Sequence, residues 1–174
     1  MLVRLPHHYY DSTTTNAISR ASNQVWFGSY QNQLSLLENC NSNLVLIGDS
    51  LIKNLKFYPN IWQKFFGKHG VVNYGIGRDS IQHVLWRTNN LIFPKTLEYV
   101  FIHCGTNNLN RNLPIEIVNG IIAIGISCKK KNNLSVLLSG LLPRDNGHSI
   151  NRNKIEYINY QLEKFCRDNS DFYL

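Results

Sequence analysis

The chain has 174 residues, of which 43% are hydrophobic, and this length and composition predict one folded domain and exclude general disorder. No apolar run approaches the roughly 20 residues of a membrane-spanning helix, and the N-terminal segment lacks the apolar stretch of a secretory signal. We therefore expect a cytoplasmic protein without a membrane span.

The net charge of +7 permits contact with nucleic acid or another anionic partner, but it does not by itself indicate one. The densest basic run is Lys129, Lys130 and Lys131, which follows a helical pattern and is interpreted as a solvated helix C-terminus. The four cysteines are widely spaced and form no C-x-x-C pair, so reduced thiols are expected in place of disulfides or a metal site.

Residues 1–40 are polar and show little periodicity. They are predicted to be a loosely held N-terminal extension, with one short helix permitted in "SYQNQLSLLENC". The main domain is predicted to span residues 41–174.

From residue 44 onward, apolar runs alternate with helical patterns. Buried strands are expected at 44–47, 71–72, 99–104 and 134–138, with a fifth in the terminal "DFYL". Three helices are expected between them, and their apolar faces begin at Ile81, Ile115 and Ile155. Trp62 and Trp86 also fall in predicted helices and are expected to pack in the core. The alternation predicts an α/β fold with a parallel sheet of about five strands.

Sites in open α/β folds form beyond the carboxyl ends of the strands. The segments expected there are "GDS" (48–50), "NYGIGRDS" (73–80), "CGTNN" (104–108) and "GLLPRDNGHS" (140–149). Polar groups replace the apolar runs abruptly in these segments, so the candidate site is expected at this edge.

Ser50 ends the first of these segments and has two interpretations. It is either the N-cap of the next helix or a nucleophile presented at its start. Asn107 is either a turn residue or a side-chain amide that donates a hydrogen bond to a tetrahedral oxyanion. The "GIG" at 75–77 is either a plain turn or a source of backbone N–H donors.

Two histidines lie within predicted elements: His83 is expected to be a surface or packing residue, and His103 a core residue. Asp145 and His148 match the string Asp-x-x-His beyond the fourth strand, although "DNG" is also ordinary turn sequence. The pair is therefore a weak candidate for a general base and its orienting carboxylate.

Four blocks in this order, "LVLIGDSL", "NYGIGRDSIQHVLWR", "YVFIHCGTNNL" and "LSGLLPRD", resemble the SGNH (GDSL-type) hydrolases. The likeness extends to the catalytic subunits of intracellular platelet-activating factor acetylhydrolase and to the esterase domain of some non-LTR retrotransposon proteins. It covers residues 44–174 and implies a three-layer, flavodoxin-like fold. The implied activity is ester hydrolysis through an acyl-serine, without a metal or other cofactor.

The resemblance also implies roles for individual residues. Ser50 becomes the nucleophile, and Asn107 and the backbone N–H of Arg78 become oxyanion donors, with Gly77 at the substrate. Arg78 stands where the family has a glycine. The family's Asp-x-x-His after the fifth strand is not found before the sequence stops, so we expect a missing last helix, a partly uncovered sheet face and impaired catalysis.

The resemblance leaves two alternatives to an active esterase. The first is a catalytically inactive SGNH-fold remnant, either a fragment of a longer coding sequence or a decayed mobile-element domain such as a retrotransposon's, that binds esters or pairs with an intact copy as a homo-oligomer. The second is a basic module that associates with nucleic acid, which rests on the net charge of +7. The expected substrate of an active form is a small-molecule ester.

Overall fold

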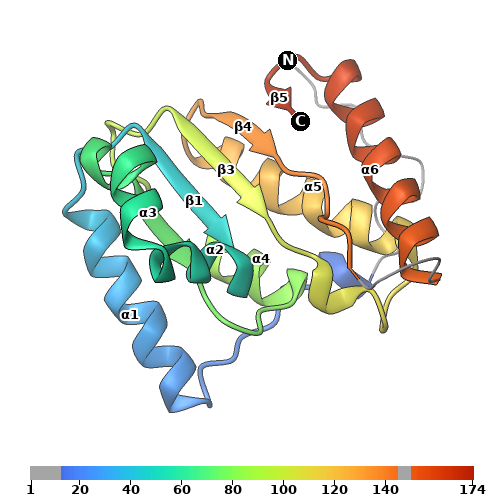
Figure 1. Ribbon diagram of the computed structural model, residues 1–174, viewed down its shortest axis with the longest axis horizontal. Helices are drawn as coiled ribbons and strands as arrows, with labels where there is room; N and C mark the ends of the chain where they lie inside the picture. Colours follow the sequence, from blue (N-terminus) through green and yellow to red (C-terminus); the bar gives the residue numbers. More distant parts are fainter. Residues whose placement is uncertain (1–12, 145–149) are drawn as a thin grey trace.

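The computed structural model describes residues 13–144 and 150–174, which form one sheet with helices on both sides (Figure 1). The strands are β1 (Leu44–Gly48), β2 (Val72–Gly75), β3 (Tyr99–His103), β4 (Ser135–Leu138) and β5 (Phe172–Tyr173). The α-helices are α1 (Gln24–Glu38), α2 (Ser50–Asn54), α3 (Pro59–Phe65), α4 (Ile81–Asn89), α5 (Pro114–Lys131) and α6 (Ile150–Asp168). Short 3-10 turns are η2 (Thr13–Thr15), η3 (Leu55–Phe57), η4 (Gly67–His69) and η5 (Thr106–Asn108).

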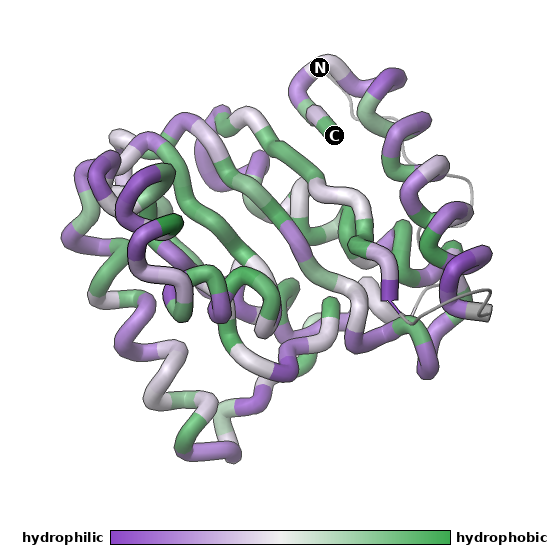
Figure 2. The backbone as a smooth tube through the Cα atoms, viewed as in Figure 1, coloured by the Kyte–Doolittle hydropathy of each residue, from purple (hydrophilic) through white to green (hydrophobic). Residues whose placement is uncertain are grey.

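The strand order is β2-β1-β3-β4-β5, and every neighbouring pair is parallel. The predicted parallel α/β sheet is therefore confirmed, and each expected strand position holds a strand. Figure 2 shows hydrophobic residues along the central strands, as their burial on the sheet requires. At the carboxyl edge, Gly48 pairs with both Gly75 and His103, so the segments after β1, β2 and β3 emerge together.

Helix α1 corrects the interpretation of residues 1–40 as loosely held for the part of that segment that it forms, Gln24–Glu38. Trp26, Tyr30 and Leu37 are buried in the main core. The rings of Trp26 and Tyr30 stack with their centroids 5.7 Å apart. Both rings also contact Trp86 of α4. The three buried residues follow one another by four and seven positions and so lie on one side of α1, whereas other hydrophobic residues of the helix, such as Val25 and Leu36, are exposed. Whether a domain boundary lies near residue 40 stays a prediction.

The two faces of the sheet differ in their cover. Val100 and Ile102 of β3 are fully buried, whereas Tyr99 on the other face is 41% exposed and Phe101 is half-buried. Figure 1 shows this second face turned toward the viewer, with no helix of the described residues across the middle of β3 and β4. The expected partly uncovered face is therefore present in the described structure.

The same structure also describes the cysteines, the basic run at the end of α5 and the character of the helices. All four cysteines are free, and Cys104 and Cys128 are buried. The basic run does end helix α5, where Lys131 Nζ donates to the carbonyls of Asn89 and Leu91 at 2.8 and 2.7 Å, and Lys129 pairs with Asp171. None of the helices in the described ranges is long and apolar enough to cross a membrane.

Candidate active site

Ser50 lies at the junction of β1 and α2. The preceding Asp49 is the N-cap, and its side chain accepts a hydrogen bond from the Leu51 N–H at 2.9 Å. The interpretation of Ser50 as the N-cap is therefore wrong by one residue, because Asp49 takes that role and Ser50 is the first residue of the helix. This leaves the Ser50 side chain free of capping.

Two glycines allow the backbone around Ser50 to pack closely. A Cβ on Gly48 would lie 2.1 Å from the carbonyl oxygen of His103, and one on Gly75 would lie 2.3 Å from the amide nitrogen of Lys53. No side chain fits at either position without moving the backbone. The glycine of "GDS" therefore brings β1 against the end of β3, and Gly75 brings the end of β2 against α2.

Ser50 opens onto a cavity of about 310 Å³ at the carboxyl edge of the sheet. Its wall is formed by Ser50, Leu51, Thr106, Asn107, Leu142, Pro143 and Arg144. The lining comes from three of the four segments predicted to meet there. Arg144 donates to the Thr106 carbonyl at 2.9 Å and so ties two of these segments together.

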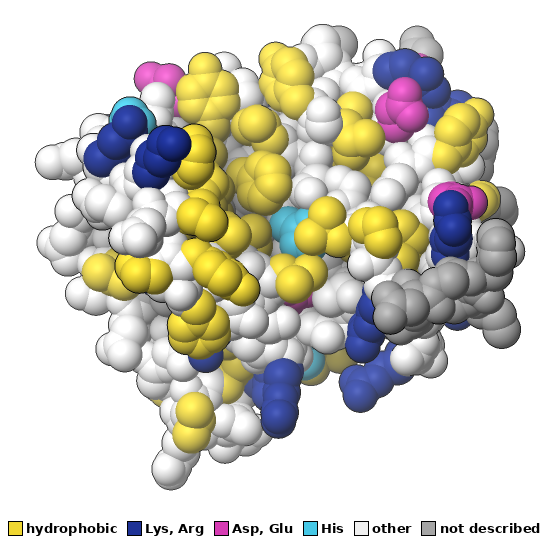
Figure 3. Space-filling view, viewed as in Figure 1, with side chains coloured by type: hydrophobic (Ala, Val, Ile, Leu, Met, Phe, Trp, Pro, Cys, Tyr) yellow, Lys and Arg dark blue, Asp and Glu magenta, His cyan; other side chains and the backbone are white. Residues whose placement is uncertain are grey.

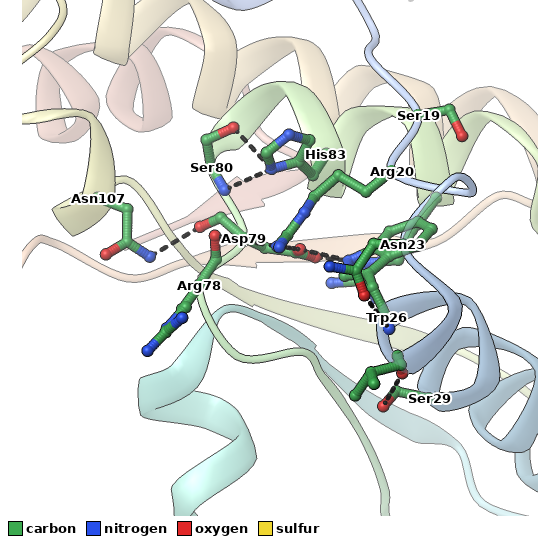
Figure 4. Close-up of polar contacts among 12 residues, drawn as sticks. Ser19, Arg20, Asn23, Trp26, Ser29, Arg78, Asp79, Ser80, His83 and Asn107 are labelled. Atoms are coloured by element: carbon green, nitrogen blue, oxygen red, sulfur yellow. Dashed lines mark hydrogen bonds and ion pairs between the residues drawn. The ribbon is translucent and has the colours of Figure 1, made fainter.

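Arg78 has φ of +63°, a left-handed conformation that glycine adopts readily and arginine does not. The backbone thus keeps the shape expected of the family's glycine, although the residue differs. Figure 4 shows the Arg78 side chain extending away from the contacts around Asp79, and the residue is exposed. Its backbone N–H therefore remains compatible with a role as a hydrogen-bond donor.

Asn107 is positioned by the same loop. Its side-chain Nδ2 donates to the Asp79 carbonyl at 2.8 Å (Figure 4). An amide nitrogen carries two hydrogens, so one donor remains for a ligand in the cavity. The next residue, buried Asn108, accepts from the Ile81 N–H at 3.0 Å and joins the turn after β3 to the start of α4.

A buried charged network, here called the Asp79 network and made of Arg20, Trp26, Asp79 and Arg87, holds the loop. Asp79 Oδ1 accepts from Trp26 Nε1 at 2.7 Å, and Oδ2 accepts from Arg87 Nε at 2.9 Å. Arg20 makes a longer contact of 3.4 Å to Oδ1. Asp79 and Arg87 are both fully buried.

Arg87 extends this network to the strand that carries Ser50. Its Nη1 donates to the Tyr74 carbonyl and its Nη2 to the Gly48 carbonyl, both at 2.9 Å. One guanidinium thus joins the ends of β1 and β2 to the loop that contains Arg78. The sequence analysis did not predict a role for Arg87. Arg87 follows Val84 by three positions and so lies on the apolar face of its helix, and this spacing could have indicated a buried, paired arginine.

The histidines do not reach Ser50 in the described structure. His83 Nδ1 accepts from the Ser80 N–H at 3.0 Å and lies 2.9 Å from the Ser80 hydroxyl, so it helps to cap α4 (Figure 4). His103 is buried, which confirms its expected place in the core, and its Nδ1 lies 3.0 Å from Ser139 Oγ. Burial lowers the pKa of both imidazoles.

The hydroxyl of Ser50 makes no hydrogen bond with any residue in the described ranges. The candidate base pair Asp145 and His148 lies outside these ranges. Within residues 13–144 and 150–174, no group of three or more His, Cys, Asp or Glu side chains could hold a metal ion.

Asp49 has an unusual electrostatic environment beside Ser50. Burial raises the pKa of its carboxyl from 3.8 to about 6, and the hydrogen bond from the Leu51 N–H opposes this shift only in part. Its second oxygen, Oδ2, is also buried, and the nearby Gly105 N–H lowers the pKa of the carboxyl by less than burial raises it. A titratable group thus lies next to the candidate nucleophile.

Comparison with known proteins identifies the family, although no family model matches the chain. The human platelet-activating factor acetylhydrolase IB subunit alpha2 is 32% identical over 126 residues, which are 70% of this chain and 53% of that protein. The rat alpha1 subunit is 37% identical over 121 residues, or 67% of this chain and 50% of that protein. The chain thus spans about half the length of these curated relatives.

Solved structures share the fold. A GDSL-like lipase from Bacteroides thetaiotaomicron superposes with a TM-score of 0.68 at 18% identity, covering 83% of this chain and 76% of that one. The SGNH-hydrolase family esterase AlinE4 gives a TM-score of 0.56 at 23% identity, covering 71% and 72%. The chain belongs to the SGNH (GDSL-type) hydrolase family and is related to the alpha subunits of platelet-activating factor acetylhydrolase IB.

Proposed function

We propose that this chain is an SGNH-type serine ester hydrolase that cleaves carboxylic esters with small acyl groups, such as acetyl esters, through an acyl-Ser50 intermediate. One observation carries the proposal: Ser50 and Asn107 line one cavity, and Asn107 is bonded to the loop whose residue 78 keeps a glycine-like backbone. The homology to esterases and acetylhydrolases supports an ester as the substrate class.

In the proposed reaction, Ser50 Oγ attacks the ester carbonyl and the alcohol leaves, after which water hydrolyses the acyl-serine. The tetrahedral oxyanion accepts hydrogen bonds from the N–H groups of Ser50 and Arg78 and from the free Nδ2 hydrogen of Asn107. Loss of one such donor typically lowers the rate by about 10²–10³. Gly77, next to Arg78, is proposed to adjoin the substrate.

The proposed reaction also needs a general base for Ser50. His83 and His103 each use Nδ1 in a contact with a different serine, and neither bonds Ser50. We therefore keep His148, with Asp145 as its orienting carboxylate, as the proposed base pair of this chain. Without a base, a serine hydroxyl is a weak nucleophile, and only the residual effect of the oxyanion donors remains.

A fluorophosphonate probe tests the nucleophile directly. The purified chain and its Ser50→Ala variant are exposed to the probe and weighed intact, with Ser19→Ala as a control for an exposed serine outside the cavity. We expect one adduct in the parent chain and in Ser19→Ala, and none in Ser50→Ala. His148→Ala should slow the labelling if His148 is the base, and a folded parent chain that takes up no probe contradicts the esterase proposal.

A second candidate is an inactive SGNH-fold module, favoured by the contacts of His83 and His103, which each engage another serine instead of Ser50. Such a module would bind an ester in the Ser50 cavity without turnover, as a retrotransposon-derived remnant or as one partner of a homo-oligomer. Ester binding by calorimetry without labelling would favour it. For either candidate we propose a cytoplasmic location. Association with nucleic acid has support only from the net charge of +7.

A further inference from the structure

The segment from η3 to η4, residues 55–69, places large apolar side chains in solvent. None of η3, α3 and η4 contains a buried residue. Phe57 is 71% exposed, Tyr58 62%, Ile61 52% and Phe65 56%. Phe57, Tyr58 and Ile61 line one surface hollow, and Phe65 follows Ile61 by about one turn of α3. Exposed apolar side chains gathered in this way mark an interaction surface in soluble proteins.

The same segment is strongly basic. No Asp or Glu occurs between Ser50 and Arg78, whereas four lysines do. These exposed residues are Lys53, Lys56, Lys64 and Lys68. Lys56 Nζ lies 5.7 Å from the Trp62 ring centroid, and Lys64 Nζ lies 5.1 Å from that of Phe65, so cations and aromatic rings are interleaved. Figure 3 shows hydrophobic side chains gathered over the α2–α3 region, with basic side chains beside them.

We propose that residues 53–68, here called the aromatic–lysine ledge, dock the protein on the surface of an anionic lipid membrane. Aromatic side chains favour the boundary between lipid headgroups and acyl chains, and lysines beside them attract acidic headgroups while their stems lie along the apolar surface. Burial of apolar area and electrostatic attraction act together in this kind of binding. The ledge offers both on one short segment.

The charge of the ledge argues against a second copy of the chain as its occupant. A symmetric dimer contact places the same patch on both sides. The lysines of one copy would then face those of the other, and like charges across an interface are unfavourable. An anionic surface instead complements the lysines and the aromatic side chains together.

The ledge also adjoins the candidate active site. Leu51 is 39% exposed, lines the Ser50 cavity and belongs to α2, which leads directly into the ledge. Docking at the ledge would therefore bring the cavity close to the lipid headgroups. Membrane binding itself does not depend on whether Ser50 reacts, so it is testable apart from the esterase proposal.

The test is flotation of the full chain with vesicles of phosphatidylcholine alone and with vesicles of equal parts phosphatidylcholine and phosphatidylserine. We expect binding to the anionic vesicles, weakened by salt, and little binding to the neutral ones. The double variant Phe57→Ala with Ile61→Ala should lower the partition coefficient about tenfold or more, because two large apolar anchors are removed. Lys56→Gln with Lys64→Gln should lower it roughly tenfold at low salt.

Matched controls separate the ledge from surface properties in general. Val25→Ala with Ile92→Ala removes apolar side chains that are 82% and 85% exposed elsewhere, and Lys95→Gln with Lys130→Gln removes two exposed lysines elsewhere. These variants should bind as the parent chain does. Absence of binding to anionic vesicles, or equal losses in ledge and control variants, overturns the proposal. A dimer in sedimentation that dissociates on Phe57→Ala with Ile61→Ala would instead assign the ledge to a second copy.

Discussion

The Asp79 network and the aromatic–lysine ledge both join the Ser50 segment, but they distribute polarity in opposite ways. In the network, Asp79 and Arg87 are fully buried and pair with each other. In the ledge, aromatic side chains face solvent and no residue of α3 is buried. Burial of a charge costs free energy unless partners compensate its desolvation, whereas a cluster of exposed apolar side chains marks a surface for contact. The first region therefore positions the site, and the second is available for contact.

The largest effect is expected from breaking the network at Arg87. Arg87→Met leaves the Asp79 carboxylate buried without its main partner and frees the carbonyls of Gly48 and Tyr74. We expect the free energy of unfolding to fall by about 3–5 kcal/mol, measured by urea denaturation.

The control for this prediction is Arg152→Gln, which breaks an exposed pair with Glu156 and should change stability by at most about 0.5 kcal/mol. Adding Asp79→Asn to Arg87→Met should recover part of the loss, because it removes the unpaired charge. Equal losses in the free energy of unfolding for Arg87→Met and Arg152→Gln would show that the Asp79 network does not stabilise the fold.

Asp49→Asn should stabilise the folded protein, in contrast to Arg87→Met, and the size of this effect should depend on pH. The folded-state pKa of Asp49 is raised from 3.8 to about 6, so the folded protein holds its proton while the unfolded chain releases it. Stability contributed by this group is therefore greatest below pH 3.8 and is lost as the pH rises to about 6. Asparagine carries no such penalty, and we expect it to raise the free energy of unfolding by up to about 3 kcal/mol above that range.

The measurement is urea denaturation of both proteins across this pH range. The difference between them should vanish in acid and grow to its full value near neutral pH. A constant difference at all pH values would mean that the Asp49 carboxyl keeps its ordinary pKa.

Trp26→Phe compares the network with the ledge directly. The substitution keeps an aromatic ring in the core but removes the Nε1 donor to Asp79, a bond of 2.7 Å. A hydrogen bond to a charged group contributes about 1.5–3 kcal/mol, and we expect a loss of this size in urea denaturation. Trp62→Phe in α3, where the ring is half-buried, is the matched control and should cost far less. Similar losses would assign the effect of Trp26 to ring size alone.

The smallest effect is expected at Arg78. Arg78→Gly relieves the left-handed backbone at φ +63°, while the greater freedom of glycine in the unfolded chain offsets part of the gain. We expect unfolding free energies within about 1 kcal/mol of the parent, and labelling of Ser50 that is retained. Arg78→Val should be clearly less stable because a β-branched residue resists this conformation. A stable valine variant would contradict the left-handed backbone at this position.

Much of the fold follows from local sequence pattern. Runs such as 44–47 and 99–102 are apolar without interruption, which is typical of parallel strands in a covered sheet, and the helical spacing between them requires parallel strands. The partly uncovered face at Tyr99 and Phe101 does not show in this pattern. Parallel strands present their carboxyl ends at one edge, so the order of strands and helices along the chain is enough to place Ser50, Arg78 and Asn107 at the same edge. The left-handed backbone at Arg78 likewise agrees with the glycine that the family has there.

Tertiary structure decided the features that depend on contacts between distant segments. Sequence pattern placed Trp62 in the core, which is wrong, because α3 contacts mainly its own flanking turns and leaves that ring half-buried. It also treated residues 1–40 as loosely held, whereas Trp26 reaches Asp79 across 53 positions of the chain. Arg87 is a charged residue that is buried, and Phe57 is an aromatic residue that is exposed, so each lies opposite to the usual position of its residue type. Only the folded chain decides such cases, because the partners that compensate a buried charge, and the neighbours that would cover an aromatic ring, come from elsewhere in the sequence.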